Sequence, residues 1–207
     1  MKKLALAIVL LSVLAAAAQA QLPSGNVFFG YSYAHSTLPA PALLPDQSGI
    51  VSSGNAGLNG WNASLQGKFL PLIGFVADFS GHYGSQRVTT VCGFVSGCVP
   101  TRVNMNATVY HFLLGPEISV SIGKVRPFAH ALFGAGHLRE SAAGPFNASD
   151  TAFADALGGG IDYRLLGPLR WRLQADFLQD RFFSGTQQNF SGTQQNFRFS
   201  TGPVLHF

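Results

Sequence analysis

Apolar and polar residues alternate with a period of two along most of this chain. The clearest stretch is 169–177, where Leu, Trp, Leu, Ala and Phe hold the odd positions and Arg, Arg, Gln and Asp the even positions. Because side chains alternate between the two faces of a β-strand, this pattern predicts one apolar face and one polar or charged face. Helix-period stripes are missing after the first twenty residues. The chain is therefore expected to be all-β.

The alternation predicts eight long strands. Each covers about 10–14 residues, whereas strands of soluble proteins average about five or six. A tilted strand that crosses a membrane needs about 9–11 residues, so the predicted lengths favour membrane crossing. The predicted strands are 25–36, 58–69, 73–84, 106–117, 125–138, 152–165, 169–180 and 196–207.

The connections between these strands alternate in length. Short turns are predicted at 70–72, 119–124 and 166–168, and long loops at 37–57, 85–105, 139–151 and 181–195. Short periplasmic turns and long external loops are typical of outer-membrane barrels. Since every backbone group must be paired in hydrocarbon, the last strand must pair with the first. We predict an eight-stranded antiparallel up-and-down transmembrane β-barrel in the bacterial outer membrane, surrounded by its lipids.

The N-terminus predicts a signal peptide. Lys2 and Lys3 precede an apolar run over 4–18, and Ala18-Gln19-Ala20 forms an A-x-A cleavage site. The alternative is a membrane anchor, which is less favoured because the run has about 15 residues and a spanning helix needs about 20. The expected domains are a signal peptide over 1–20 and a barrel over 21–207.

Strand parity also predicts which side chains meet lipid. The expected lipid-facing residues include Val27, Phe29, Leu65, Phe75, Phe79, Phe112, Leu114, Leu173, Phe197, Phe199, Leu205 and Phe207. Tyr and Trp side chains tend towards strand ends, where aromatic girdles meet the membrane interface. In the strands at 125–138 and 152–165 the alternation is weak, so their facing stays open.

The opposite parity predicts a charged lumen. The charge network is expected to comprise Asp78, Glu117, Arg126, Asp162, Arg170, Arg172, Asp176, Asp180 and Arg198. Folding about the turns puts Glu117 nearly opposite Arg126, Asp162 between Arg170 and Arg172, and Asp180 near Arg198. Side chains just fill the interior of an eight-stranded barrel, so these charges must pair with one another or with water.

Composition narrows the possible partners. Charged residues make up 11% of the chain, against about 25% in soluble domains, and no Lys/Arg cluster suggests nucleic acid. Cys92 and Cys98, with five residues between them, predict a loop disulfide in an oxidising compartment. The alternative is a metal site, but no further ligands stand at zinc-finger spacing. The histidines are expected to hydrogen-bond, and no metal or other cofactor is expected.

Several segments resemble the OmpA-like outer-membrane β-barrel family in its short form. They are WRLQADF at 171–177, RFSTG at 198–202, LGP at 114–116, RPF at 126–128 and GGGIDY at 158–163. The resemblance covers 22–207. It implies that the terminal Phe207, with Leu205 on the same face, is the signal read by the barrel-assembly machinery. Larger family members add a peptidoglycan-binding domain, which is not expected here.

Three functions are compatible with such a barrel. We expect a non-catalytic, monomeric structural or interaction barrel whose external loops contact a cell-surface or matrix ligand. The first alternative is a small pore lined by the lumen charges. The second is a lipid A-modifying enzyme, but the His-x-Ser pair of one deacylase class is missing, since His35 is followed directly by Ser36. A palmitoyl-transfer site could use His137 and Ser141 with Glu140 and Asp150 nearby.

Overall fold

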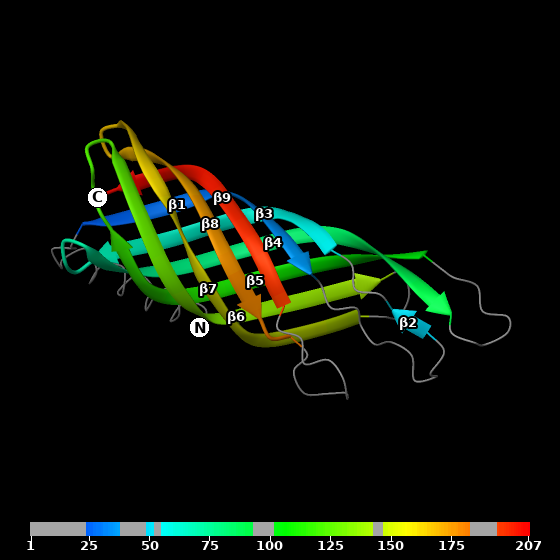
Figure 1. The fold of residues 1–207 in the computed structure, drawn as a ribbon. Coiled ribbons are helices and arrows are strands. Elements are labelled where there is room, and N and C mark those ends of the chain that lie inside the picture. Colours follow the sequence, from blue (N-terminus) through cyan, green and yellow to red (C-terminus); the bar gives the residue numbers. More distant parts are fainter. Residues whose placement is uncertain (1–23, 38–48, 52–54, 93–101, 143–146, 183–193) are drawn as a thin grey trace, which may run out of the picture.

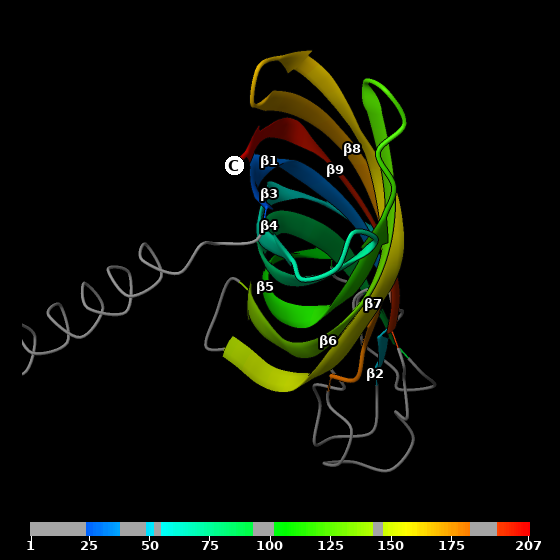
Figure 2. The ribbon, with the colours of Figure 1, turned by 90° about the vertical axis from the view of Figure 1, so that its left-hand side faces the viewer.

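The computed structural model describes residues 24–37, 49–51, 55–92, 102–142, 147–182 and 194–207. Its long strands wrap into one tilted, closed sheet (Figures 1 and 2). The strands are β1 (Gly25–Thr37), β2 (Gly49–Val51), β3 (Asn55–Lys68), β4 (Ile73–Cys92), β5 (Arg102–Ser119), β6 (Val125–Ala142), β7 (Asn147–Leu166), β8 (Leu169–Asp180) and β9 (Gln194–His206). No helix in these segments is long and apolar enough to cross a membrane.

Eight of these strands form the barrel wall, in antiparallel pairs between chain neighbours. The exception to neighbour pairing is the closing seam, where β1 pairs with β9 in a register that sets Tyr31 opposite Thr201. The short β2 pairs only with the outer end of β4 and is an addition to the wall. The predicted eight-stranded up-and-down barrel, closed by pairing its last strand with its first, is confirmed.

Four strands are longer than the sequence pattern predicts. β4 and β7 have 20 residues each, and β5 and β6 have 18 each. Residues 85–92, 102–105, 139–142 and 147–151 therefore belong to strands, and the prediction that they are loop was wrong. The ladders continue there, for example between Gln86 and Met105 and between Ser141 and Asn147. Backbone pairing extends a strand without any alternation of side chains, because each ladder satisfies N–H and C=O groups.

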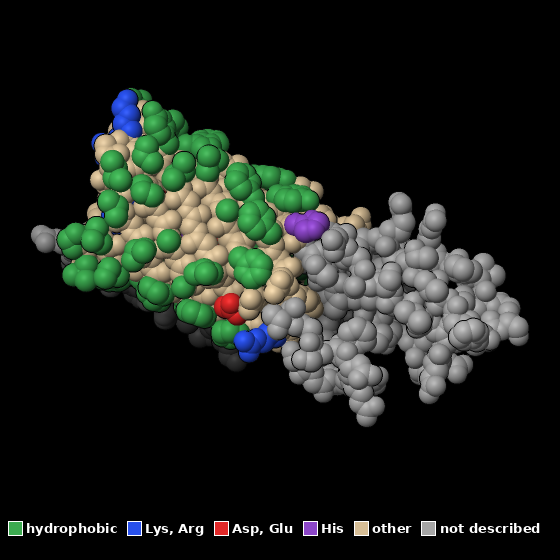
Figure 3. All heavy atoms as spheres, viewed as in Figure 1, with side chains coloured by type: hydrophobic (Ala, Val, Ile, Leu, Met, Phe, Trp, Pro, Cys, Tyr) green, Lys and Arg blue, Asp and Glu red, His purple; other side chains and the backbone are tan. Residues whose placement is uncertain are grey.

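The faces of the wall follow strand parity. Along β8 every second side chain is buried, while Trp171, Leu173 and Phe177 lie on the outside. Figure 3 shows apolar side chains distributed over the outer surface of the wall. The expected lipid-facing residues lie on that surface, among them Val27, Phe112 and Leu205. An exposed apolar surface of this extent fits hydrocarbon rather than water.

The structure settles the facing of the two ambiguous strands. β6 turns His130 and Leu132 inward and Phe133 outward. β7 turns Asp162 inward and Leu157 outward. Glycines at 158–160 hide the alternation in the sequence, but the register with β8 fixes the parity of the whole strand.

The end of the barrel with the short turns also holds the C-terminus (Figure 1). We call it the periplasmic end, because short turns are periplasmic in outer-membrane barrels. Gly123 and Gly167 have φ values of 60° and 54°, which suit glycine in these tight turns. Phe207 exchanges backbone hydrogen bonds with Gly25 at 2.8 and 3.0 Å. Its side chain lies outside, as does that of Leu205.

Two predictions fall on residues that the structure does not describe. The signal peptide over 1–20 is one of them. The other is the disulfide between Cys92 and Cys98, because Cys98 and the side chain of Cys92 lie outside the described part of the chain.

Candidate functional site

The periplasmic half of the lumen holds a buried ion-pair cluster around Arg126. Its Nη2 donates to Glu117 Oε1 at 2.8 Å and to Ser119 Oγ at 2.9 Å. Its Nη1 lies 3.6 Å from Asp162 Oδ2. Strand parity aims these side chains inward from β5, β6 and β7, which are adjacent in the wall. The predicted opposition of Glu117 and Arg126 is thus a direct ion pair in the structure.

Arg172 lies beside that cluster and fills the centre of the lumen. Its Nε and Nη2 donate to the two carboxylate oxygens of Asp162 at 2.7 and 2.8 Å. The guanidinium lies between two aromatic rings, 5.1 Å from the centroid of Phe28 and 4.4 Å from that of Phe128. Gln66 on β3 accepts a further hydrogen bond at 3.0 Å. Arg172 therefore occupies the bore rather than lining an open path.

A second buried guanidinium, Arg198 on β9, bridges two carboxylates. Its Nη1 lies 2.8 Å from Asp78 Oδ1 on β4, and its Nε lies 2.8 Å from Asp176 Oδ2 on β8. His130 lies 2.8 Å from the other oxygen of Asp176. The prediction that Asp180 lies near Arg198 is corrected here. In the β8–β9 register, Arg198 is opposite Asp176 and Asp180 is opposite Gln194.

Asp180 belongs instead to a layer nearer the external end. It lies 3.1 Å from Nε2 of His111 on β5, and it accepts a hydrogen bond of 2.7 Å from Asn196 on β9. In the same region Ser32 on β1 lies 2.9 Å from His82 Nε2 and 2.9 Å from Ser200 Oγ. These groups connect strands that are far apart in the sequence.

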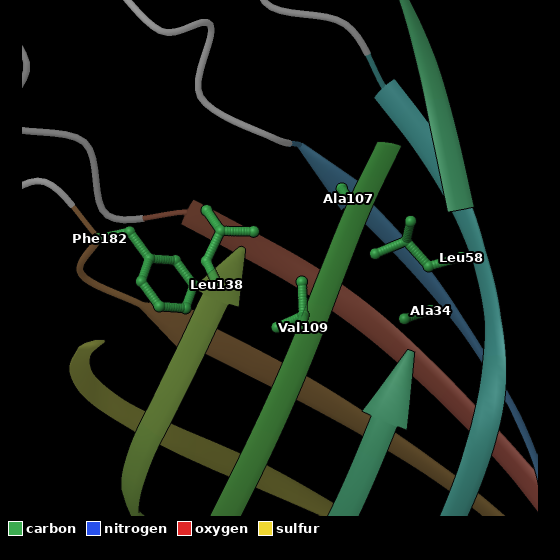
Figure 4. Close-up of a cluster of buried hydrophobic side chains, with 6 residues drawn as sticks. All are labelled: Ala34, Leu58, Ala107, Val109, Leu138 and Phe182. Carbon is green, nitrogen blue, oxygen red and sulfur yellow. The ribbon is translucent and has the colours of Figure 1, made fainter. Parts of the chain in front are cut away.

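An apolar plug lies above this layer. Six side chains converge from the external ends of four strands and the segment after β8: Ala34, Leu58, Ala107, Val109, Leu138 and Phe182 (Figure 4). All six are buried. Lower down, a second apolar cluster includes Val76, Leu113, Leu132 and Leu178. The interior thus consists of stacked polar and apolar layers packed by side chains.

The Ser32–His82 pair resembles half of a nucleophilic triad, and it requires a third group. A carboxylate must orient the histidine through its other ring nitrogen. In the described residues Nδ1 of His82 has no hydrogen-bond partner. Both side chains are fully buried beneath the plug. The pair therefore has neither the acid nor the access that hydrolysis of a bulky substrate requires.

The nine charged residues predicted for the lumen are all buried. Seven of them form ion pairs with one another. Asp180 instead contacts the imidazole of His111, and Arg170 forms no ion pair within the described residues. Sequence reasoning did not assign Ser32, Asn62, Gln66 or Gln174 to this network. Their inward parity was the available signal, but uncharged polar residues are equally common on exposed strand faces. Among the described side chains, no cluster of three His, Cys, Asp or Glu could hold a metal ion.

The alternative enzyme residues at the external end do not converge. His137 lies on the outer face of β6, where its Nδ1 is 2.7 Å from Thr151 Oγ1. Glu140 faces the lumen and is 1% exposed, with both carboxylate oxygens unpartnered in the described part of the chain. Ser141 shares the parity of His137 rather than that of Glu140. Asp150 accepts a hydrogen bond from the backbone N–H of Thr151.

Comparison with known proteins identifies the fold. No protein-family model and no curated protein sequence matches the chain. Among solved structures, the chain resembles Ail, the attachment invasion locus protein of Yersinia pestis (13% identity, TM-score 0.53, 90% of this chain and 100% of that chain). It also resembles Neisserial surface protein A (11% identity, TM-score 0.56, 89% and 97%) and the outer membrane protein OprG from Pseudomonas aeruginosa (9% identity, TM-score 0.50, 90% and 96%). Ail has also been solved with the heparin analogue sucrose octasulfate.

These similarities extend over whole barrels, so the shared feature is the complete eight-stranded fold. Together with the exposed apolar surface and the closed sheet, they place this chain among bacterial outer-membrane barrels. At these identities the likeness shows the fold alone. The role of the barrel must come from its own residues.

Proposed function

We propose that this outer-membrane barrel is a non-conducting, non-catalytic scaffold whose external end contacts a cell-surface or matrix partner. The observation that carries the proposal is the packed lumen. Arg126, Arg172 and Arg198 are fully buried in ion pairs. Arg172 and Arg198 also reach across the bore, to Gln66 on β3 and to Asp78 on β4. A barrel packed in this way holds its external segments rigidly but offers no path through the membrane.

The packing argues against the pore alternative in a specific way. A water-filled lumen would leave charged side chains solvated, as in larger barrels. Here the carboxylates of Asp162 and Asp176 are held by guanidinium groups in direct contact, and the apolar plug closes the external side. Conduction would require ion pairs to break and Leu138 and Phe182 to move together.

The external end is the remaining surface for a partner. Strands β4 to β7 extend beyond the predicted membrane strands, so they lift their connections away from the lipid surface. Arg139 is exposed there, and the guanidinium of Arg181 lies over the ring of Phe153 at 5.6 Å. The heparin analogue bound by Ail supports a sulfated polysaccharide as the first probe, and exposed arginines suit sulfate groups.

The test is adhesion of bacterial cells that display the protein. Deleting residues 93–101 and 183–193 together removes no residue of a described strand, and a short Gly-Ser linker in place of each segment keeps the paired strand ends connected. We expect this double deletion to abolish binding to heparin-coated beads and matrix-coated wells while heat-modifiable folding is unchanged. The matched control is Lys124→Gln, which removes one charge at the periplasmic end, where an extracellular ligand has no access. Adhesion that survives the double deletion would refute the proposed contact surface.

The proposal extends to family and chemistry. We place the chain in the OmpA-like family, folded by the barrel-assembly machinery through Phe207, and monomeric in the membrane. The absence of a catalytic role is supported by the incomplete Ser32–His82 pair. Lipid A mass spectra from cells with and without the protein are expected to be identical, and a new lipid A species would establish the enzyme alternative.

A further inference from the structure

The periplasmic mouth of the barrel is surrounded by basic side chains. We call Lys68, Lys124, Arg164, Arg170 and His206 the basic mouth. Lys68 and His206 follow inward-facing Gln66 and Val204 by two residues, so they share the lumen parity at the ends of β3 and β9. Figure 3 shows Lys and Arg side chains at this left-hand end, whereas the Asp or Glu side chain in view lies farther along the wall, towards the other end.

Three members of the basic mouth, Lys124, Arg164 and Arg170, are close neighbours. Arg164 on β7 is directly opposite Arg170 on β8 in the ladder. The backbone N–H of Arg164 donates to the carbonyl of Lys124 at 2.8 Å, which joins the β5–β6 turn to the same group. His206 on β9 lies within 3.0 Å of Gly25 O and Asn26 Oδ1. Like charges directly opposite in a sheet are destabilising unless something neutralises them.

No carboxylate forms an ion pair with this group within the described residues. Glu117 and Asp162 are the acidic residues of the periplasmic half, and both are buried. They are paired with Arg126 and Arg172 instead. The four Lys and Arg side chains of the basic mouth therefore lack a carboxylate in direct contact in the described part of the chain.

The mouth also presents hydrogen-bond donors that lack acceptors. Arg170 is only 5% exposed, and its buried Nε has no partner among the described residues. The Nε of Arg126 and the Nε2 of Gln66, deeper in the same end, are also buried without a partner. A buried donor without an acceptor costs free energy, so an acceptor from outside the chain that reaches Arg170 would stabilise this end.

We propose that the basic mouth binds a phosphate group at the periplasmic surface of the outer membrane. The tetrahedral anion matches the parallel N–H donors of arginine and the point charge of lysine. Two sources can present it: the head group of an anionic phospholipid in the inner leaflet, or a free phosphate compound in the periplasm. This site lies at the opposite end from the proposed contact surface, so the two proposals stand or fall separately.

The test uses the full mature barrel in nanodiscs of zwitterionic lipid. One arm adds short-chain phosphatidylglycerol and the other adds inorganic pyrophosphate, with binding followed by native mass spectrometry and by the shift in melting temperature. We expect saturable binding that weakens as salt rises, because exposed charges are screened. Binding of phosphatidylglycerol without binding of pyrophosphate identifies a lipid head-group site. Binding of both compounds identifies recognition of the phosphate group itself.

The decisive variant is Lys124→Gln with Arg164→Gln. Both side chains are exposed, so their replacement leaves the buried network intact. Affinity is expected to fall by about tenfold or more for each charge-assisted bond removed. The matched control is Arg139→Gln, which removes one exposed charge at the external end and should leave binding unchanged. No saturable binding in either arm, or equal binding by the double variant and the wild type, would overturn the proposal.

Discussion

Arg172 donates two parallel hydrogen bonds to Asp162, from Nε to Oδ1 at 2.7 Å and from Nη2 to Oδ2 at 2.8 Å. Both residues are completely buried, and they are cross-strand neighbours in the β7–β8 ladder. A buried pair of this kind is strongly coupled, since either charge alone would be left without compensation in a dry interior.

Replacing one partner is therefore expected to destabilise the barrel. Arg172→Met leaves the Asp162 carboxylate with only Arg126, at 3.6 Å, and should lower the free energy of unfolding by about 3–5 kcal/mol. The measurement is urea unfolding of the refolded barrel in detergent. Arg139→Met is the exposed control, expected to have little effect. The double variant Arg172→Met with Asp162→Leu should recover part of the loss, and a further loss would contradict the coupling.

A second prediction concerns the lipid-facing surface of the barrel. Leu173 on β8 is 44% exposed in the middle of the apolar surface, and Leu173→Arg should cost about 2–4 kcal/mol near the bilayer midplane. Leu169 lies on the same strand face at the periplasmic end, where the cost of Leu169→Arg falls to about 0–1 kcal/mol. Folding equilibria in lipid vesicles compare the two. Equal costs, or a mature protein that folds in water without detergent, would contradict the membrane assignment.

The closing seam depends on a close approach of two backbones. A Cβ on Gly30 would lie 2.3 Å from the carbonyl oxygen of Thr201, so Gly30→Ala forces β1 away from β9. We expect a loss of about 1–3 kcal/mol from overpacking, measured as a lower melting temperature of the heat-modifiable form. Gly67→Ala is the control, because a Cβ there meets nothing within 4 Å. A neutral Gly30→Ala would show that the seam tolerates a wider spacing.

The packed lumen predicts that the barrel does not conduct ions. Purified protein in planar bilayers is expected to show no discrete conductance, because ion pairs and the apolar plug occupy the bore. Arg172→Ala should gain none, since Arg198 and the plug remain in place. Regular unitary currents from the wild type, scaling with salt concentration, would restore the pore alternative.

The alternation of apolar and polar residues along the strands predicted the inward or outward facing of most side chains. Along 169–177 the apolar and charged positions separate without exception, and the structure places them outside and inside. The facing of Phe207 and Leu205 followed in the same way. At 158–160 the residues are all glycine, so the sequence has no alternation of apolar and polar side chains. The inward or outward facing of β7 there follows from its ladder with β8.

Partners within the lumen were harder to predict. Glu117 and Arg126 are joined by a short turn, so counting residues from the turn finds the pair. Asp180 and Arg198 are joined by a long connection, and the same counting missed the register by four residues along β8. Arg198 also contacts Asp78 on β4, which is adjacent neither in sequence nor in the wall.

The alternation along the chain was enough to predict the number of strands in the barrel wall, its closure and the inward or outward direction of most side chains. Those properties depend on a two-residue period and on the need to pair every backbone group in hydrocarbon. Three other features became visible only in the folded barrel: which charges meet, the apolar plug at the external end, and the basic side chains at the periplasmic mouth. Contacts across a barrel depend on strand tilt and stagger, which arise when the whole sheet closes and are not encoded in any single strand.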